Sequence, residues 1–234
     1  MYYFYLMESF STVLASYSKY PIAILDTAIP LEGYKKLNLS VTNTDLKSVN
    51  ITDPTACEAY INGLLEHKKG EVAYGGYLEQ RNLYTDKASF TGNSEAQRNI
   101  HLGIDYWCNA GTKVVVPLPG TLHSFKNNAT MGDYGPTIIL EHNLNGYRFY
   151  TLYGHLSLES LQNLQIGKQF EVGSTLGTLG TAAINVNYAP HLHFQLIQDI
   201  QGYHGDYPGV SSLTDLDFYK KNCPDPNLLL KMDI

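Results

Sequence analysis

The sequence predicts a mainly β protein, with a twisted antiparallel sheet as its core and a small α+β extension. Two observations favour this class. The 234 residues include 19 tyrosines and 20 glycines, which are typical of strands and of tight turns respectively. From about residue 71 the chain consists of short β-rich runs separated by Gly, Pro, Asn and Asp, a spacing that indicates antiparallel pairing.

The N-terminal part of the chain has a different texture. Residues 8–19 can form a short helix, and residues 55–69 a longer one with Asp53 as its cap and Gly70 beyond its end. Between the two helices, residues 37–46 show the alternation of a strand. We expect both helices to lie outside the main sheet.

Strands are predicted along the rest of the chain. They fall at the runs TKVVVP (112–117), GTLHSF (120–125), PTIILEH (136–142), YRFYTLY (147–153) and APHLHFQL (189–196). A glycine-rich stretch, residues 166–181, matches neither phosphate-binding loop pattern and is assigned to turns. We therefore divide the chain into an N-terminal mixed or helical extension (1–70), a β-rich domain (71–205) and a C-terminal extension packed on the core (206–234).

Composition argues against several classes of partner and site. The formal net charge is −6 and the sequence pI is about 5.7, and no cluster of Lys and Arg is interleaved with aromatic residues, so nucleic acid and anionic lipid are disfavoured. The three cysteines form no CxxC pair, which argues against a disulfide scaffold and a thiolate zinc site. No uncharged apolar stretch approaches about 18 residues, so no membrane span is expected. The N-terminus is a poor signal peptide, and the sequence by itself predicts a cytoplasmic protein.

Two histidines one residue apart, His191 and His193, stand inside an apolar run. In a strand, side chains at i and i+2 leave the same face, with Cα atoms about 6.6 Å apart. Both imidazoles can therefore converge on one point, while Leu192 and Phe194 face the core. The alternative is an ordinary strand with two hydrogen-bonded histidines, and the tripeptide alone does not decide between them.

A second pair, His101 and Asp105, lies in the run IHLGIDYW. In a straight strand these residues would be about 13 Å apart, too far to share a metal ion. The chain must bend if they act together, and Gly103 permits a bend. An i, i+4 pair on a helix is the other geometry that brings them together, although glycine is unfavourable within a short helix. Alternatively, Asp105 is a turn or cap residue and His101 a surface residue.

One more histidine stands out among the eight. His155 follows Gly154 at a predicted turn, which would present the imidazole at the end of the sheet. Two neutral imidazoles and a carboxylate supply the ligands of an open catalytic Zn²⁺ site, and two further histidines remain for proton transfer. The remaining histidines are isolated and are interpreted as structural or solvated: His67, His123, His142 and His204.

Four stretches in order, HLGID, YGHLS, GKQFEVGSTLGTLG and APHLHF, resemble the LytM or lysostaphin type of zinc metallopeptidase, peptidase family M23. The signature of that family is HxxxD followed far downstream by HxH, and the resemblance covers roughly residues 98–198. Three additional stretches, GGYLEQRNLY, GDYGPTIILEH and CPDPNLL, resemble a subgroup of M23 domains that also occurs fused to class III aminotransferase-like proteins.

The resemblance implies a fold, a metal, an activity and a set of roles. The sheet would be of the LytM and lysostaphin type, with a groove over one Zn²⁺ per chain. His101, Asp105 and His193 would be the zinc ligands, and His155 and His191 the catalytic pair. The chain would be a metalloendopeptidase that hydrolyses peptide bonds, with the peptides of bacterial peptidoglycan as its substrate partner. The family is usually exported, which differs from the cytoplasmic location that the sequence by itself predicts. Gln195 departs from the Glu that often follows HLHF, and it lies outside the five implied site residues.

Two other functions stay open at this point. One is a non-catalytic LytM-like binding or regulatory module. The retention of all five polar residues argues against it. The other is a zinc hydrolase that acts on a small amide. Four aromatic residues could line the groove, although packing is the favoured role for each: Tyr106, Trp107, Tyr150 and Tyr153. The sequence gives no information on oligomeric state.

Overall fold

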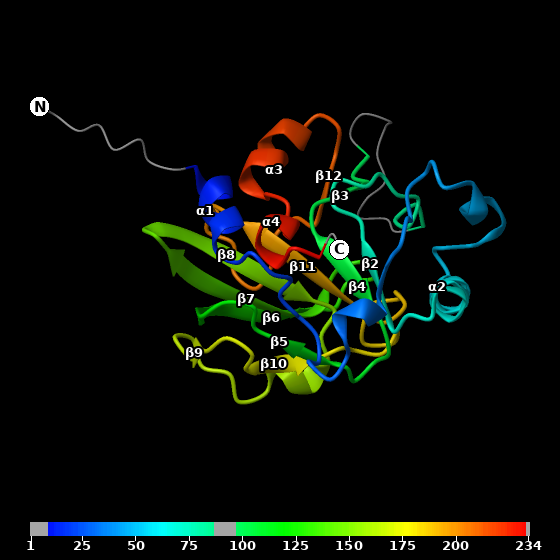
Figure 1. The fold of residues 1–234 in the computed structure, drawn as a ribbon. Helices are drawn as coiled ribbons and strands as arrows, with labels where there is room; N and C mark the ends of the chain where they lie inside the picture. The colour runs from blue at the N-terminus through cyan, green and yellow to red at the C-terminus, as the bar shows by residue number, and fades with distance from the viewer. Residues whose placement is uncertain (1–8, 87–96, 233–234) are drawn as a thin grey trace, which may run out of the picture.

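The computed structural model describes residues 9–86 and 97–232, and its centre is a large mixed β-sheet (Figure 1). Within these residues the sheet has eight strands, in the order β1-β2-β4-β11-β8-β7-β6-β9. Their bounds in that order are Tyr34–Lys36, Val72–Gly75, Ile104–Trp107, His191–Ile197, Tyr147–Gly154, Gly135–Leu144, Gly120–Asn128 and Gln169–Phe170. The mainly β class is confirmed.

The expectation of a wholly antiparallel sheet is wrong at one edge. β1 pairs with β2 in parallel, with Tyr34 opposite Val72. A parallel neighbour needs a crossover connection, and the segment between the two strands contains the long helix α2 (Pro54–Lys68). The other pairs of the large sheet are antiparallel.

Two small two-stranded sheets accompany the large one. β5 (Lys113–Val115) pairs with β10 (Thr175–Thr178). β3 (Ile100–His101) pairs with β12 (Val210–Ser211), and this pairing joins the C-terminal region to the chain at His101, the first predicted site residue.

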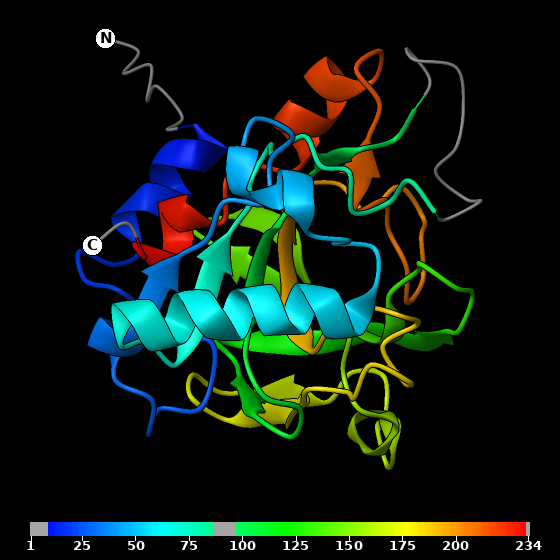
Figure 2. The same cartoon turned by 90° about the vertical axis from the view of Figure 1, so that its right-hand side faces the viewer.

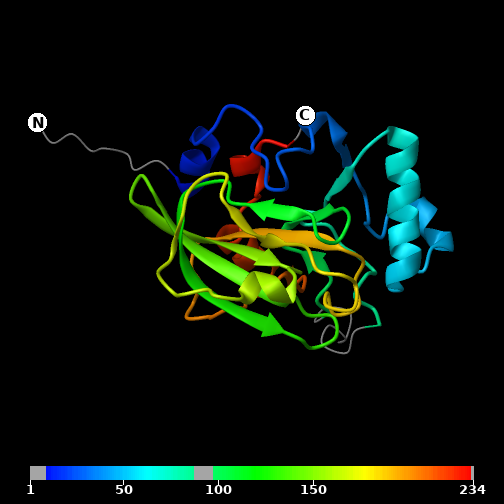
Figure 3. The same ribbon diagram turned by 90° about the horizontal axis from the view of Figure 1, so that it is seen from below.

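Both predicted N-terminal helices are confirmed. α1 (Phe10–Ser16) is capped by the Ser9 side chain, and α2 begins after Asp53, whose carboxylate accepts a hydrogen bond from the Ala56 amide at 2.8 Å. Figures 2 and 3 show α2 lying at the β1–β2 end of the sheet. Shorter helices complete the described chain: η1 (Leu31–Gly33), η2 (Thr44–Ser48), η4 (Leu158–Leu161), α3 (Leu216–Asn222) and α4 (Asn227–Leu230).

The strand predicted over residues 37–46 is wrong. The strand in this region is β1, and the chain after it turns into η2. Leu37 and Leu39 are buried as the pattern required. The Leu39 amide, however, donates to the Glu79 carboxylate at 2.9 Å instead of to a neighbouring strand, so the segment packs without extending the sheet.

Segments from both ends of the chain share the main hydrophobic core with the sheet. Phe10 and Leu14 of α1 and Leu229 and Leu230 of α4 belong to the cluster that also contains Phe194 of β11. A second cluster packs under α2 and includes Trp107. The three-part division of the chain stays a prediction. No helix among the described residues is both long and apolar enough to cross a membrane.

Candidate metal centre

The two histidine-containing motifs meet at the centre of the sheet. The β-structure is interrupted between β3 and β4, at Leu102 and Gly103. The chain bends there, so that the side chains of His101 and Asp105 turn toward one another. A Cβ atom on Gly103 would lie 2.6 Å from the Phe194 carbonyl oxygen and 2.8 Å from the His193 ring. Only glycine fits at this point of the bend without a shift of the neighbouring strand.

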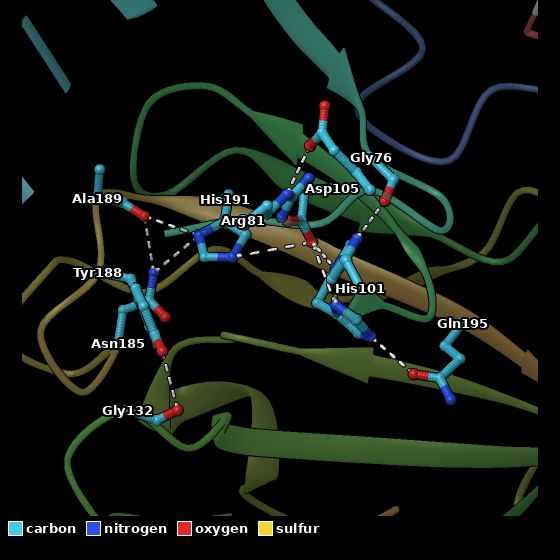
Figure 4. Close-up of polar contacts among 12 residues, drawn as sticks. Gly76, Arg81, His101, Asp105, Gly132, Asn185, Tyr188, Ala189, His191 and Gln195 are labelled. Atoms are coloured by element: carbon cyan, nitrogen blue, oxygen red, sulfur yellow. Dashed lines mark hydrogen bonds and ion pairs between the residues drawn. The ribbon is translucent and has the colours of Figure 1, made fainter. Parts of the chain in front are cut away.

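β11 brings the other two histidines to this bend. In the antiparallel register with β4, His193 lies opposite Asp105 and His191 opposite Trp107. Leu192 and Phe194 belong to the hydrophobic core, so the predicted two-faced strand is confirmed. Figure 4 shows the ring of His191, from β11, directed toward Asp105, from β4.

Three polar atoms converge at this point. The distances are 2.8 Å between His101 Nε2 and His193 Nδ1, 3.1 Å between His193 Nδ1 and Asp105 Oδ1, and 3.2 Å between His101 Nε2 and Asp105 Oδ1. All three residues are buried, with 1–2% of their surface exposed. They form a group with metal-ligand spacing within the described part of the chain.

The outward hydrogen bonds of the two imidazoles show which nitrogen of each ring carries the hydrogen and which presents a lone pair inward. His101 Nδ1 lies 2.9 Å from the Gly76 carbonyl oxygen, which can only accept, so Nδ1 carries the hydrogen. His193 Nε2 lies 2.9 Å from Gln195 Oε1, and Gln195 Nε2 donates to the Pro208 carbonyl at 3.1 Å, which fixes the orientation of the amide. Both inward-facing nitrogens are therefore hydrogen-free.

A cation bound among the three acceptor atoms would offset their mutual repulsion. Two nitrogen lone pairs and a carboxylate oxygen at such short range repel one another unless a positive charge lies among them. Ligands about 2.0–2.1 Å from a tetrahedral Zn²⁺ are separated by about 3.3 Å, close to the three spacings observed. The donor set of two imidazoles and one carboxylate also suits zinc, so the residues present fit a zinc ion.

The same environment controls the protonation of the ligands. Burial, followed by the charge of Arg81, lowers the pKa of His101 to about 4. Burial alone would raise the pKa of Asp105, but His101 and Arg81 outweigh it and hold that pKa well below its ordinary value. A neutral imidazole and an ionised carboxylate are the forms that bind metal ions.

Arg81 and Glu79 form a second layer behind the carboxylate. Arg81 Nη1 donates to Asp105 Oδ2 at 2.6 Å, and Arg81 Nε to Glu79 Oε2 at 2.6 Å. Sequence reasoning missed Arg81 because nothing local marks a distant residue as the partner of Asp105. It also set Gln195 outside the site, although the strand period of two places this residue on the same face as His193.

His191 lies beside the three converging atoms. Its Nδ1 donates to the Ala189 carbonyl at 2.8 Å, so Nε2 is hydrogen-free, and Nε2 lies 3.9 Å from Asp105 Oδ1. The ring stacks on Trp107 with centroids 3.9 Å apart. Burial lowers the pKa of His191 to about 4.

His155 completes the group of five. It adopts a left-handed backbone conformation, with φ of 63°, directly after the end of β8. Its ring centroid lies 4.1 Å from that of His191, and its Nδ1 is buried without a hydrogen-bond partner. Burial, then the charges of His191 and His193, lowers the pKa of His155 well below its ordinary value. The structure thus brings together all five residues singled out by sequence.

A cavity of about 250 Å³ opens over these residues. The four aromatic residues considered for its lining are buried and do not line the cavity, so their packing role is the correct one. Other aromatic residues line it instead: Tyr84, Tyr134, Tyr188, Tyr203 and Tyr207. Their side chains come from loops, where sequence periodicity gives no information on direction. The four histidines interpreted as structural or solvated do not line this cavity.

The buried His-Asp-His group, with two further histidines in the same cavity, has the donor set of the open metal sites of metal-dependent hydrolases. Residues 99–205 match the model of peptidase family M23. The chain is 32% identical over 140 residues to a Haemophilus influenzae protein called an uncharacterized metalloprotease. That match covers 57% of this chain and 27% of the other protein, so the chain spans about a quarter of the length of this curated relative.

Two peptidases of known structure match part of the chain. The catalytic domain of lysostaphin from Staphylococcus simulans is 23% identical, with a TM-score of 0.38, over 63% of this chain and 88% of that one. A zinc-containing peptidase from Vibrio cholerae is 22% identical, with a TM-score of 0.36, over 45% of this chain and 29% of that one.

Proposed function

We propose that the protein is a zinc-dependent metalloendopeptidase. The observation that carries this proposal is the convergence of three hydrogen-free acceptor atoms, from His101, Asp105 and His193, with two more imidazoles in the same cavity. We propose one Zn²⁺ per chain, held by these three residues. Bound there, the ion would supply Lewis acidity toward water and toward a peptide carbonyl.

The two remaining imidazoles divide the proton transfers. His191 Nε2 is hydrogen-free because Nδ1 donates to Ala189, so we assign it the role of accepting a proton from the attacking water. Trp107 holds the plane of this ring by stacking. His155 is a neutral imidazole whose ring centroid lies 4.1 Å from that of His191, and we assign it hydrogen-bond donation to the carbonyl oxygen as negative charge develops there.

The proposed substrate is a peptide from bacterial peptidoglycan. The match of residues 99–205 to peptidase family M23 supports this substrate class. The cavity supports a peptide ligand, since tyrosine rings line it beside the charged centre. Such rings offer apolar surface together with hydroxyl groups that hydrogen-bond to backbone amides.

The test is hydrolysis of purified peptidoglycan and of short peptides by the full chain, measured as the release of free amines. Activity should disappear with a chelator and return with zinc. His155→Ala and His191→Ala should each lower kcat by about 10²–10⁴-fold while the protein stays folded and keeps its zinc. Full turnover in both variants would contradict the assigned roles.

A hydrolase for small amides is the second candidate. We propose that the chain belongs to the subgroup of M23 domains found fused to aminotransferase-like proteins. The three stretches that resemble this subgroup supply Arg81, Tyr134 and Cys223, which surround the site: Arg81 contacts Asp105, Tyr134 lines the cavity, and Cys223 contacts Gln195. Turnover of non-peptide amides with no cleavage of any peptide would favour this candidate over the peptidase.

A further inference from the structure

We propose that Arg81 is a positioning residue of the metal centre, which dedicates one oxygen of Asp105 to the metal by binding the other. This inference rests on the proposed zinc site. It concerns a residue that lies outside residues 99–205, the part of the chain that matches the family.

The two oxygens of Asp105 have separate partners. Oδ1 faces His101 and His193 at 3.2 and 3.1 Å. Oδ2 accepts a hydrogen bond from Arg81 Nη1 at 2.6 Å, and the Arg81 side chain is only 1% exposed. A carboxylate with both oxygens free can bind a metal ion through either or both. Because the Arg81 guanidinium occupies Oδ2, only Oδ1 is left to bind the metal ion.

Arg81 is itself held firmly, as a positioning residue must be. Its Nε donates to Glu79 Oε2 at 2.6 Å, and the other oxygen of Glu79 accepts from the Leu39 amide at 2.9 Å. Its backbone amide donates to the Asn99 carbonyl at 2.9 Å. The buried guanidinium therefore lies between two carboxylates, which compensate its charge.

The same segment provides the partner of a second ligand. At the end of β2, Gly75 lies opposite Asp105, and the following Gly76 has a φ of 105°. This backbone conformation directs the Gly76 carbonyl to His101 Nδ1. A Cβ atom on Gly76 would overlap the Arg81 guanidinium, so glycine leaves the space through which Arg81 reaches Asp105.

Figure 4 shows Arg81 and Gly76 on the same side of the ligands. The segment that contains both residues thus orients two of the three ligand side chains. Outer contacts of this kind typically change metal affinity by about 10–100-fold. A purely structural ion pair would change the stability of the fold without a specific effect on the metal.

The experiment measures the zinc dissociation constant of the full chain by competition with a chromophoric chelator, beside thermal unfolding of the same samples. The variants are Arg81→Gln, which removes the charge, and Arg81→Lys, which keeps the charge but loses the planar fork. Ile51→Ala is the matched control, since Ile51 belongs to the hydrophobic cluster under α2 and is buried. It should destabilise the fold by truncation while leaving the ligands untouched.

We expect zinc binding about 10–100-fold weaker in Arg81→Gln, a smaller loss in Arg81→Lys and no change in Ile51→Ala. Affinity within about twofold of wild type in folded Arg81→Gln would overturn the inference, as would an equal loss in Ile51→Ala at matched stability. If Arg81→Gln does not fold, folded Arg81→Lys decides: weaker binding than in Ile51→Ala supports the inference and wild-type affinity overturns it. Absence of zinc binding in the wild type would overturn the proposed function, and this inference with it.

Discussion

Each ligand side chain of the candidate centre directs one polar atom inward and uses the other for an outward hydrogen bond. The outward partners are the Gly76 carbonyl for His101, Arg81 for Asp105 and Gln195 for His193. This arrangement fixes the tautomer and ring orientation of both histidines, and the oxygen that Asp105 directs inward, before a metal ion arrives. The cost of assembling three mutually repelling acceptors is met by the fold.

The contact between Gln195 and His193 gives a prediction at this scale. Gln195→Leu removes the acceptor for the His193 Nε2 hydrogen, and zinc affinity should fall by about tenfold. Gln195→Glu keeps an acceptor oxygen and should retain the affinity. Chelator competition measures both values, and wild-type affinity in the leucine variant would contradict the role given to this amide.

A buried histidine away from the centre gives a pH prediction. His142 donates from Nδ1 to the Pro119 carbonyl and accepts at Nε2 from Thr151, and burial lowers its pKa to about 4. The pKa of an unfolded histidine is about 6.5, so protonation favours unfolding. The stabilisation from neutral His142 is complete above about pH 6.5 and is lost as pH falls toward about 4.

The expected loss from this residue is about 3 kcal/mol across that range. Urea unfolding of wild type and His142→Gln between about pH 7 and pH 4 would measure it, because the variant lacks the titrating group. The difference in unfolding free energy between the two proteins should shrink as pH falls. A constant difference would show that His142 does not titrate in this way.

At the scale of elements, the site depends on the crossing of two chain segments, the β3–β4 bend and β11. The period of two in HLHF was sufficient to predict that His191 and His193 share a face, because that property is local. The spacing of His101 and Asp105 was sufficient to show that a bend is needed. The partners of these segments were not predictable, since Arg81 and the parallel β1–β2 pair depend on contacts between residues distant in sequence.

Gly103 tests the importance of the bend. Gly103→Ala would place a Cβ atom 2.6 Å from the Phe194 carbonyl oxygen. The backbone at Phe194 cannot move away from this atom without displacing β11. We expect a loss of about 1–3 kcal/mol in unfolding free energy together with weaker zinc binding.

Gly63→Ala is the matched control. Gly63 lies in α2, and a Cβ atom added to it would meet nothing within 4 Å. This change should stabilise the protein by about 0.5–1 kcal/mol. Urea unfolding and chelator competition measure both variants. Unaltered stability and affinity in Gly103→Ala would contradict the account of the bend.

At the scale of the whole molecule, segments before and after the family-matched part are built into the same core. α1 and α4 contact each other, and both belong to the cluster on the sheet. Sequence indicated the helices and the C-terminal packing, but it could not show that α1 and α4 meet, because that contact depends on the path of the chain between them.

This shared core predicts cooperative unfolding. Leu14→Ala and Leu230→Ala each truncate a side chain with 0% exposure and should each cost about 2–5 kcal/mol. Both variants should still unfold in a single transition when followed by fluorescence and by circular dichroism. An early separate transition in either variant would show that the terminal segments fold independently of the sheet.

The most direct test of the central claim is the metal content of the purified protein by elemental analysis. We expect about one zinc per chain in the wild type, none in His101→Ala or His193→Ala, and an unchanged value in His204→Ala, whose side chain is outside the cavity. Full zinc content in His193→Ala, or no zinc in the wild type after titration with zinc, would contradict the assignment of the metal centre.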